Sequence, residues 1–169
     1  MKKDYMEACM NSTRQRIIQV VMIKKEATAA EIGEELPDIP RASLYRHLKI
    51  LLEAEILVVV KEIFKRGSME KTYALMEKAP YGNTNEDYNN LIRSALMGLQ
   101  GEFHRYFQGE NPDPQRDLLT VASVALVLSD EEMMEFLTAY GELVQKYIQN
   151  KPQKGRKVRK ISLISSPNE

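Results

Sequence analysis

Apolar positions recur with helical spacing at three places in the first part of the chain. An apolar run that follows a Ser-Thr-Arg-Gln segment, typical of a capping box, predicts a helix over residues 12–25. A second capping box, from Thr28 to Glu31, predicts a short helix that Pro37 ends. A stripe of leucines predicts a third helix over residues 41–54.

The pattern then changes from helical spacing to short β-type segments. Residues 56–60 are apolar and β-branched, which predicts a strand. Residues 65–68 form a turn whose glycine supplies a positive φ, and residues 69–75 alternate as a returning strand does. Three helices followed by a β-hairpin predict a winged helix-turn-helix domain over residues 1–80, whose third helix enters the major groove of DNA.

Residues 81–169 are predicted to form a second, α+β domain that carries a dimer interface. Apolar spacing predicts helices over residues 85–107 and 130–149, the latter opened by a Ser-Asp-Glu-Glu capping box. Alternation predicts strands over residues 117–128 and 157–164. Two strands make a poor sheet and two amphipathic helices leave apolar surface uncovered, so we expect a homodimer. The whole chain is then mainly α with small β regions.

Composition limits the classes of protein to which the chain can belong. It has 169 residues, of which 43% are apolar and 28% charged, and no run approaches the roughly 20 apolar residues of a membrane span. Cys9 is the one cysteine, and no apolar signal stretch follows the first residues. We therefore expect a soluble, cytoplasmic protein with no membrane partner.

The net charge of zero is an average over three unlike sectors. Residues 1–80 hold 14 basic and 12 acidic side chains, residues 81–150 hold 4 and 11, and residues 151–169 hold 6 and 1. The balance excludes a polybasic, nonspecific nucleic-acid binder. It does not exclude a specific one, because affinity depends on where the charge faces the phosphates.

The outer face of the predicted third helix is the strongest candidate for contact with double-stranded DNA. With Leu44 placed inward and about 100° per residue, the basic side chains point outward, and no acidic residue lies between Asp38 and Glu53. Arginine binds guanine with two hydrogen bonds, and hydroxyls bind phosphates or base edges. The candidate DNA-binding residues are Arg41, Ser43, Tyr45, Arg46 and Lys49 on this helix, with Lys65 and Arg66 at the hairpin tip.

These features also have ordinary structural explanations. A basic helix face is often only solvated, and a Lys-Arg-Gly tip is often only a turn. Tyr45 suits a gap beside the leucines, and His47, about 60° from the buried direction, is expected to pack rather than to bind DNA or a metal. The conjunction of helix order, basic third helix and basic tip favours nucleic-acid binding.

The Ser-Leu-Tyr-Arg-His-Leu-Lys-Ile-Leu segment at residues 43–51, followed by Ala-Glu-Ile-Leu at 54–57, resembles the winged-helix domain of ArsR-like bacterial transcription regulators. The resemblance covers about residues 10–80. It implies that this segment lies on the recognition helix, which marks Arg41, Ser43, Tyr45 and Arg46. Many such regulators sense metals through cysteine pairs or His/Asp clusters. This chain has one cysteine and two histidines, too few soft ligands, so we expect neither a metal nor a cofactor.

Methionine and aromatic side chains in the second half are candidates for a small-molecule effector pocket. Such a stripe is more often core, and methionine fills gaps without any ligand. Residues 154–160 are basic and are a candidate second DNA contact, although such runs are more often solvated strand edges. The candidate pocket residues are Met97, Phe103, Tyr106, Phe107, Met133 and Tyr140.

The sequence therefore predicts a sequence-specific DNA-binding transcriptional regulator that acts as a homodimer. Its helix over residues 41–54 is expected in the major groove, and its wing over residues 65–71 on the DNA backbone. The alternative is a winged-helix module for protein–protein contacts without specific DNA binding. An enzyme is not expected, because the chain has no glycine-rich phosphate loop, no His-x-x-x-His and no nucleophile elbow.

Overall fold

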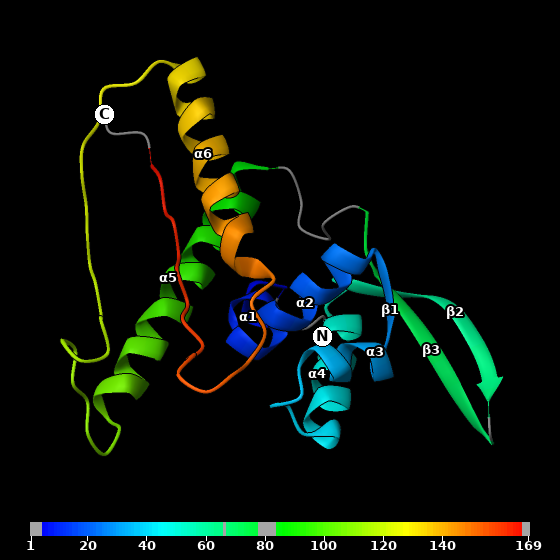
Figure 1. Ribbon diagram of the computed structural model, residues 1–169. Helices are drawn as coiled ribbons and strands as arrows, with labels where there is room; N and C mark the ends of the chain where they lie inside the picture. The colour runs from blue at the N-terminus through cyan, green and yellow to red at the C-terminus, as the bar shows by residue number, and fades with distance from the viewer. Residues whose placement is uncertain (1–4, 66, 78–83, 167–169) are drawn as a thin grey trace. The chain divides into compact units, whose positions relative to one another are not determined.

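The computed structural model describes residues 5–65, 67–77 and 84–166, and within them it has six helices and three strands (Figure 1). The described residues form two compact units, one up to Gly98 together with the residues from Lys151, and one over Leu99–Asn150. The predicted domain boundary at residue 80 lies outside the described residues. The elements are α1 (Tyr5–Met10), α2 (Ser12–Lys24), β1 (Glu26–Thr28), α3 (Ala29–Glu35), α4 (Arg41–Glu53), β2 (Leu57–Lys65), β3 (Ser68–Leu75), α5 (Asn85–Phe107) and α6 (Asp130–Ile148).

Helix starts follow the capping chemistry of the sequence, with one correction. Thr28 and Glu31 form the predicted capping box, in which the Glu31 amide donates to Thr28 Oγ1 at 3.3 Å and the Thr28 amide donates to Glu31 Oε2 at 2.7 Å. The box predicted to begin at Ser12 is wrong. Asn11 caps α2 instead, because its Oδ1 accepts from the Arg14 amide at 3.1 Å and leaves Ser12 as the first helical residue.

The three strands form an antiparallel sheet in the order β1-β3-β2 (Figure 1). Tyr73 of β3 lies opposite Ala27 of β1 on one side and Val59 of β2 on the other. The hairpin is longer than predicted, since β2 continues past Val60 through a register shift to Lys65. Gly67 has a φ of 83° in the turn, which confirms the predicted need for glycine there.

One apolar core holds the helices of this unit against the sheet. Its members come from all four helices α1 to α4, from all three strands and from the segments that join them. The predicted inward leucine stripe of α4 is confirmed. The largest fully buried side chains are Ile17, Val21, Ile32, Leu44, Leu48, Leu51 and Leu57.

α1 was not apparent from the sequence pattern, and a buried arginine holds it. Arg14 is 8% exposed, and its guanidinium donates to the carbonyl of Ala8 at 2.6 Å and to that of Glu7 at 2.6 Å. These carbonyls belong to the last turn of α1, which has no helical partners for them. Arg14 therefore satisfies the end of one helix from the first turn of the next.

Within residues 84–166 the regular secondary structure is helical only, which corrects the predicted α+β domain. α5 matches the predicted bounds, and α6 begins with the predicted capping box between Ser129 and Glu132. Residues 117–128 and 157–164, predicted as strands, have no strand structure. A strand needs a hydrogen-bonded neighbour, and the exposed fractions of Val121 (84%) and Val127 (102%) show that this segment is uncovered within the chain.

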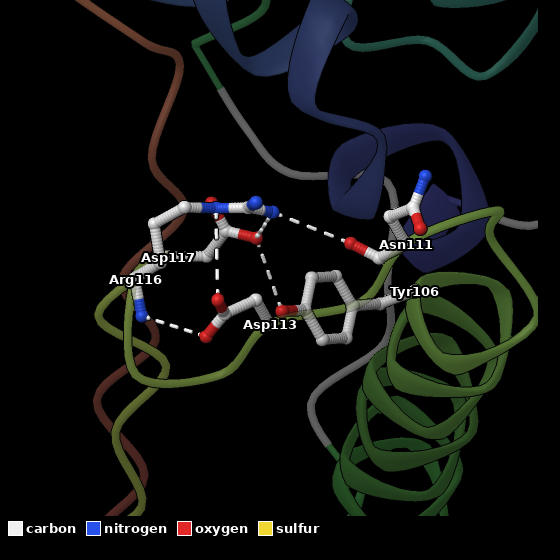
Figure 2. Close-up of polar contacts among 5 residues, drawn as sticks. All are labelled: Tyr106, Asn111, Asp113, Arg116 and Asp117. Atoms are coloured by element: carbon white, nitrogen blue, oxygen red, sulfur yellow. Dashed lines mark hydrogen bonds and ion pairs between the residues drawn. The ribbon is translucent and has the colours of Figure 1, made fainter.

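A polar network ties the end of α5 to the loop that follows it (Figure 2). The Tyr106 hydroxyl donates to Asp117 Oδ2 at 3.1 Å, and the Arg116 amide donates to Asp113 Oδ1 at 3.0 Å. The Arg116 guanidinium lies 3.5 Å from Asp117 Oδ2 and donates to the carbonyl of Asn111 at 3.3 Å. Burial and the Asp117 carboxylate raise the pKa of Tyr106. The tyrosine thus stays protonated and keeps its donor.

Among the described residues, no helix has the length and apolar character needed to cross a membrane.

Candidate nucleic-acid interface

The candidate interface is built on α4, whose two faces have opposite surroundings. Leu44, Leu48 and Leu51 are at most 2% exposed and pack into the core. Because side chains three and four residues apart share one helix face, burial of these leucines turns the positions on the opposite side of the helix outward. The core therefore fixes which side chains α4 presents to solvent.

The outward face of α4 carries all five residues that the sequence analysis singled out on this helix. Arg41, Tyr45, Arg46 and Lys49 are exposed, and Ser43 is half-buried. Tyr45 is 58% exposed, so it does not fill a gap beside the leucines. Arg46 Nη2 lies 3.5 Å from Ser43 Oγ, which keeps the guanidinium along the first turns of the helix.

Lys49 takes part in an ion pair on the same face. Its Nζ lies 3.8 Å from Glu53 Oε1, four residues further along α4. The lysine side chain is 77% exposed and the glutamate 45%, so the pair is weak and salt-sensitive. A phosphate can replace the carboxylate as the partner of Lys49.

The turn before α4 is fixed by an arginine that the sequence analysis did not single out. Arg16 of α2 donates from both Nη atoms to the two carboxylate oxygens of Asp38, each at 2.7 Å. These hydrogen bonds lower the pKa of Asp38. Pro40 follows as the N-cap of α4 and makes no side-chain capping bond. The first amides of α4 therefore remain available to an anion.

His47 lies on the inward side of α4, as the helical geometry predicted. It is 8% exposed, and its Nδ1 has no hydrogen-bond partner in the described structure. Burial, and then the positive charges of Arg14 and Arg46, lower its pKa below the usual 6.5. A neutral, buried His47 adds no charge to the outer face.

The hairpin tip is described only in part. Arg66 and the side chain of Lys65 lie outside the described residues, so their contact with DNA stays a prediction. Phe64 and Met69 lie opposite each other in the register and are 71% and 55% exposed. This apolar pair was not predicted, because Phe64 lay outside the predicted strands and turn and its partner in the register could not be known.

The candidate effector residues lie on α5 and α6. Met97, Phe103 and Phe107 are exposed, with Met97 68% exposed. The remaining three, Tyr106, Met133 and Tyr140, are half-buried, and an effector at these residues stays a prediction. The rings of Tyr106 and Phe107 meet edge to face, with their centroids 5.1 Å apart. Within the described residues, no group of three or more His, Cys, Asp or Glu side chains is arranged to hold a metal ion.

Comparison with known families identifies one segment of the chain. Residues 10–60 match the family model of a helix-turn-helix domain. The matched segment contains α2, β1, α3 and α4, and therefore the whole outward face described above. No curated protein matches the chain.

Proposed function

We propose that this helix-turn-helix protein is a sequence-specific transcriptional regulator of the ArsR-like kind, cytoplasmic and homodimeric. The observation that carries the proposal is the outward face of α4. Five residues able to bind phosphates or base edges lie there, opposite a fully buried leucine stripe, inside the segment that matches a helix-turn-helix domain.

In the proposed complex the first half of α4 enters the major groove. Arg46 binds a guanine through two parallel hydrogen bonds, and Tyr45 and Ser43 bind neighbouring phosphates or base edges. Arg41 lies at the N-terminus of α4, where its charge adds to the positive end of the helix dipole. The β2–β3 hairpin then lies along the flanking backbone as a wing.

The homodimer is proposed from the uncovered apolar side chains of α5 and α6. Neither helix has a buried residue, although each has apolar side chains at helical spacing. On α5 Ile92 is 53% exposed, and on α6 Leu143 is 50% exposed. Exposed apolar side chains that follow one helix are typical of protein interfaces, and a dimer presents two α4 helices to two half-sites. A small apolar effector would bind among the same side chains.

The decisive experiment compares wild type with Arg46→Ala on a duplex selected from a random library. We expect the variant to lose about 5- to 150-fold in affinity for the selected site, because one bidentate guanine contact is worth about 1–3 kcal/mol. Binding to unrelated duplexes should change far less. Arg93→Ala removes the same charge from the exposed surface of α5 and serves as the matched control. Retention of the wild-type sequence preference by Arg46→Ala would contradict this docking.

A second candidate function is supported by the hairpin tip. Phe64 and Met69 form an exposed apolar pair where a wing would meet phosphates, and apolar side chains are better suited to a protein partner. This candidate is a winged-helix module for protein–protein contacts without specific DNA binding. Failure of wild type to bind any duplex at low salt would favour it.

A further inference from the structure

We propose that residues 151–160, the basic segment, form a second DNA-binding surface beside the N-terminus of α4 that binds phosphates flanking the major-groove site. The inference rests on the proposed function and deepens it, because it names a second region of the chain that contacts the same duplex. It assigns a role to the basic end of the chain, which is far from α4 in the sequence.

The charge of the basic segment suits a polyanion. It contains six lysines and arginines within ten residues and no acidic residue. Five of the six side chains are exposed, and the sixth, Lys160, is half-buried. Each cation that meets a phosphate releases a condensed counterion, which is the main source of affinity for DNA.

Two contacts hold the ends of the basic segment on the helix-turn-helix unit. Lys160 Nζ donates to the carbonyl of Met10 at 2.7 Å, across 150 residues of sequence. At the other end, Lys151 Nζ lies 2.8 Å from Glu35 Oε2 at the end of α3, and Lys24 shares that carboxylate at 3.3 Å. The segment between the two contacts is thus kept close to the surface that carries α4.

The middle of the basic segment lies beside the candidate interface. Val158 lines a shallow hollow together with Ser12, Pro40 and Ser43. Pro40 is the N-cap of α4, and Ser43 is one of the candidate DNA-binding residues. Because neighbouring residues of an extended chain are less than 4 Å apart, the cations next to Val158 are placed at the edge of that interface. The basic segment therefore borders the N-terminal end of α4.

DNA fits this surface better than an acidic protein partner does. The acid-free stretch from residue 39 to 52 and the basic segment line the same hollow, and the acidic lining residue, Asp38, is paired with Arg16. The positive charges of the two regions therefore reinforce one another. An acidic partner, such as residues 81–150 of a second copy, would have to displace the duplex from that edge. That arrangement is an outcome the experiment below detects.

The test is a triple variant, Lys154→Gln/Arg156→Gln/Lys157→Gln, compared with wild type on the selected duplex. Binding is measured by fluorescence anisotropy from about 50 to 200 mM salt. Each lost phosphate contact should lower the log–log salt slope by about 0.9 and the affinity about eightfold at 0.1 M salt, so three lost contacts amount to about 500-fold. The ratio of specific to nonspecific affinity should stay unchanged, because phosphate contacts carry no sequence information.

Two controls distinguish the loss of phosphate contacts from misfolding of the variant and from a general change in net charge. Arg93→Gln/Arg105→Gln/Lys146→Gln removes three charges from residues 81–150 and should leave the salt slope at the wild-type value. The second control shortens the duplex outside the major-groove site. This should lower the log–log salt slope of wild type and leave the slope of the triple variant (called the tail variant below) unchanged. The wild-type measurement in this second control uses unmodified protein, so it does not depend on how the variant folds.

The outcomes are distinct. Wild type that binds no duplex overturns the proposed function and this inference together. If wild type binds specifically, and the tail variant has the same salt slope and an equal or higher affinity, the role of the basic segment is refuted and the proposed function stands. If the tail variant instead changes only the salt dependence of self-association, measured without DNA, the basic segment binds an acidic region of a second copy. This result also refutes DNA binding by the segment.

Discussion

Replacement of Arg14 by methionine is expected to be among the most destabilising changes in the first unit. The guanidinium is almost fully buried and donates to two carbonyls at the end of α1, both at 2.6 Å. Methionine keeps the length and the apolar stem of the side chain but has no donor. The substitution therefore removes the two hydrogen bonds while changing the packing little.

The expected cost follows from those two bonds. A hydrogen bond from a charged donor contributes about 1.5–3 kcal/mol, so two give about 3–6 kcal/mol. The bond to the Glu7 carbonyl is only partly buried, so this carbonyl can regain water when the donor is lost, which offsets part of the cost. We expect Arg14→Met to lower the free energy of unfolding by about 3 kcal/mol. The free energy of unfolding of Arg14→Lys should lie between those of wild type and Arg14→Met, because an ammonium group cannot match the two-pronged donor geometry of a guanidinium.

Urea unfolding, followed by far-UV ellipticity, measures this difference. Arg16→Met is the matched control, since it makes the same chemical change two residues further along α2. Arg16 pairs with Asp38 at 2.7 Å, but the pair is 17% and 42% exposed, so its loss should cost about 1 kcal/mol or less. Equal losses in the free energy of unfolding for Arg14→Met and Arg16→Met would refute the view that burial makes the Arg14 hydrogen bonds more stabilising.

Three further predictions follow from the same unit. Leu48→Ala should lower the free energy of unfolding by about 2–5 kcal/mol, because a side chain that is 1% exposed leaves a cavity in the core; Leu52→Ala, at a half-buried position of α4, should cost less in the same urea titration. The pKa of His47 is lowered in the folded protein, so the unfolded chain binds a proton at this side chain more readily than the folded one. Stability should therefore fall as the pH drops below about 6.5. Thermal melts at successive pH values should show a smaller decline for His47→Gln. Thr28→Ala should cost about 1 kcal/mol by removing the cap of α3, whereas Thr28→Ser should cost much less; equal melting temperatures would show that the cap contributes nothing.

The sequence predicted those elements whose signals are local. Capping boxes at Thr28 and Ser129 marked the starts of α3 and α6, because capping bonds join residues three apart. The leucine stripe of α4 located both the buried and the outward face. The candidate residues of α4 therefore lie where helical geometry placed them, although their contact with DNA stays a prediction.

The features that were missed depend on residues distant in sequence or on unusual burial. α1 has six residues, too few for a periodic pattern, and the role of Arg14 depends on its burial, whereas charged residues are usually exposed. β1 has three residues and is defined only by its pairing with β3. Alternation over residues 117–128 and 157–164 predicted strands, but alternation cannot supply the neighbouring strand whose hydrogen bonds a strand requires.

The uncovered segment over residues 118–129 makes the protein prone to aggregate during refolding. Residues 118–129 contain no charge, no proline and no glycine, and they are rich in valine and leucine. This is the composition from which cross-β aggregates form when such a stretch meets its own copies. Refolding yield should therefore fall steeply with protein concentration. Valine-to-lysine substitution at Val127, the most exposed of these side chains, should restore it.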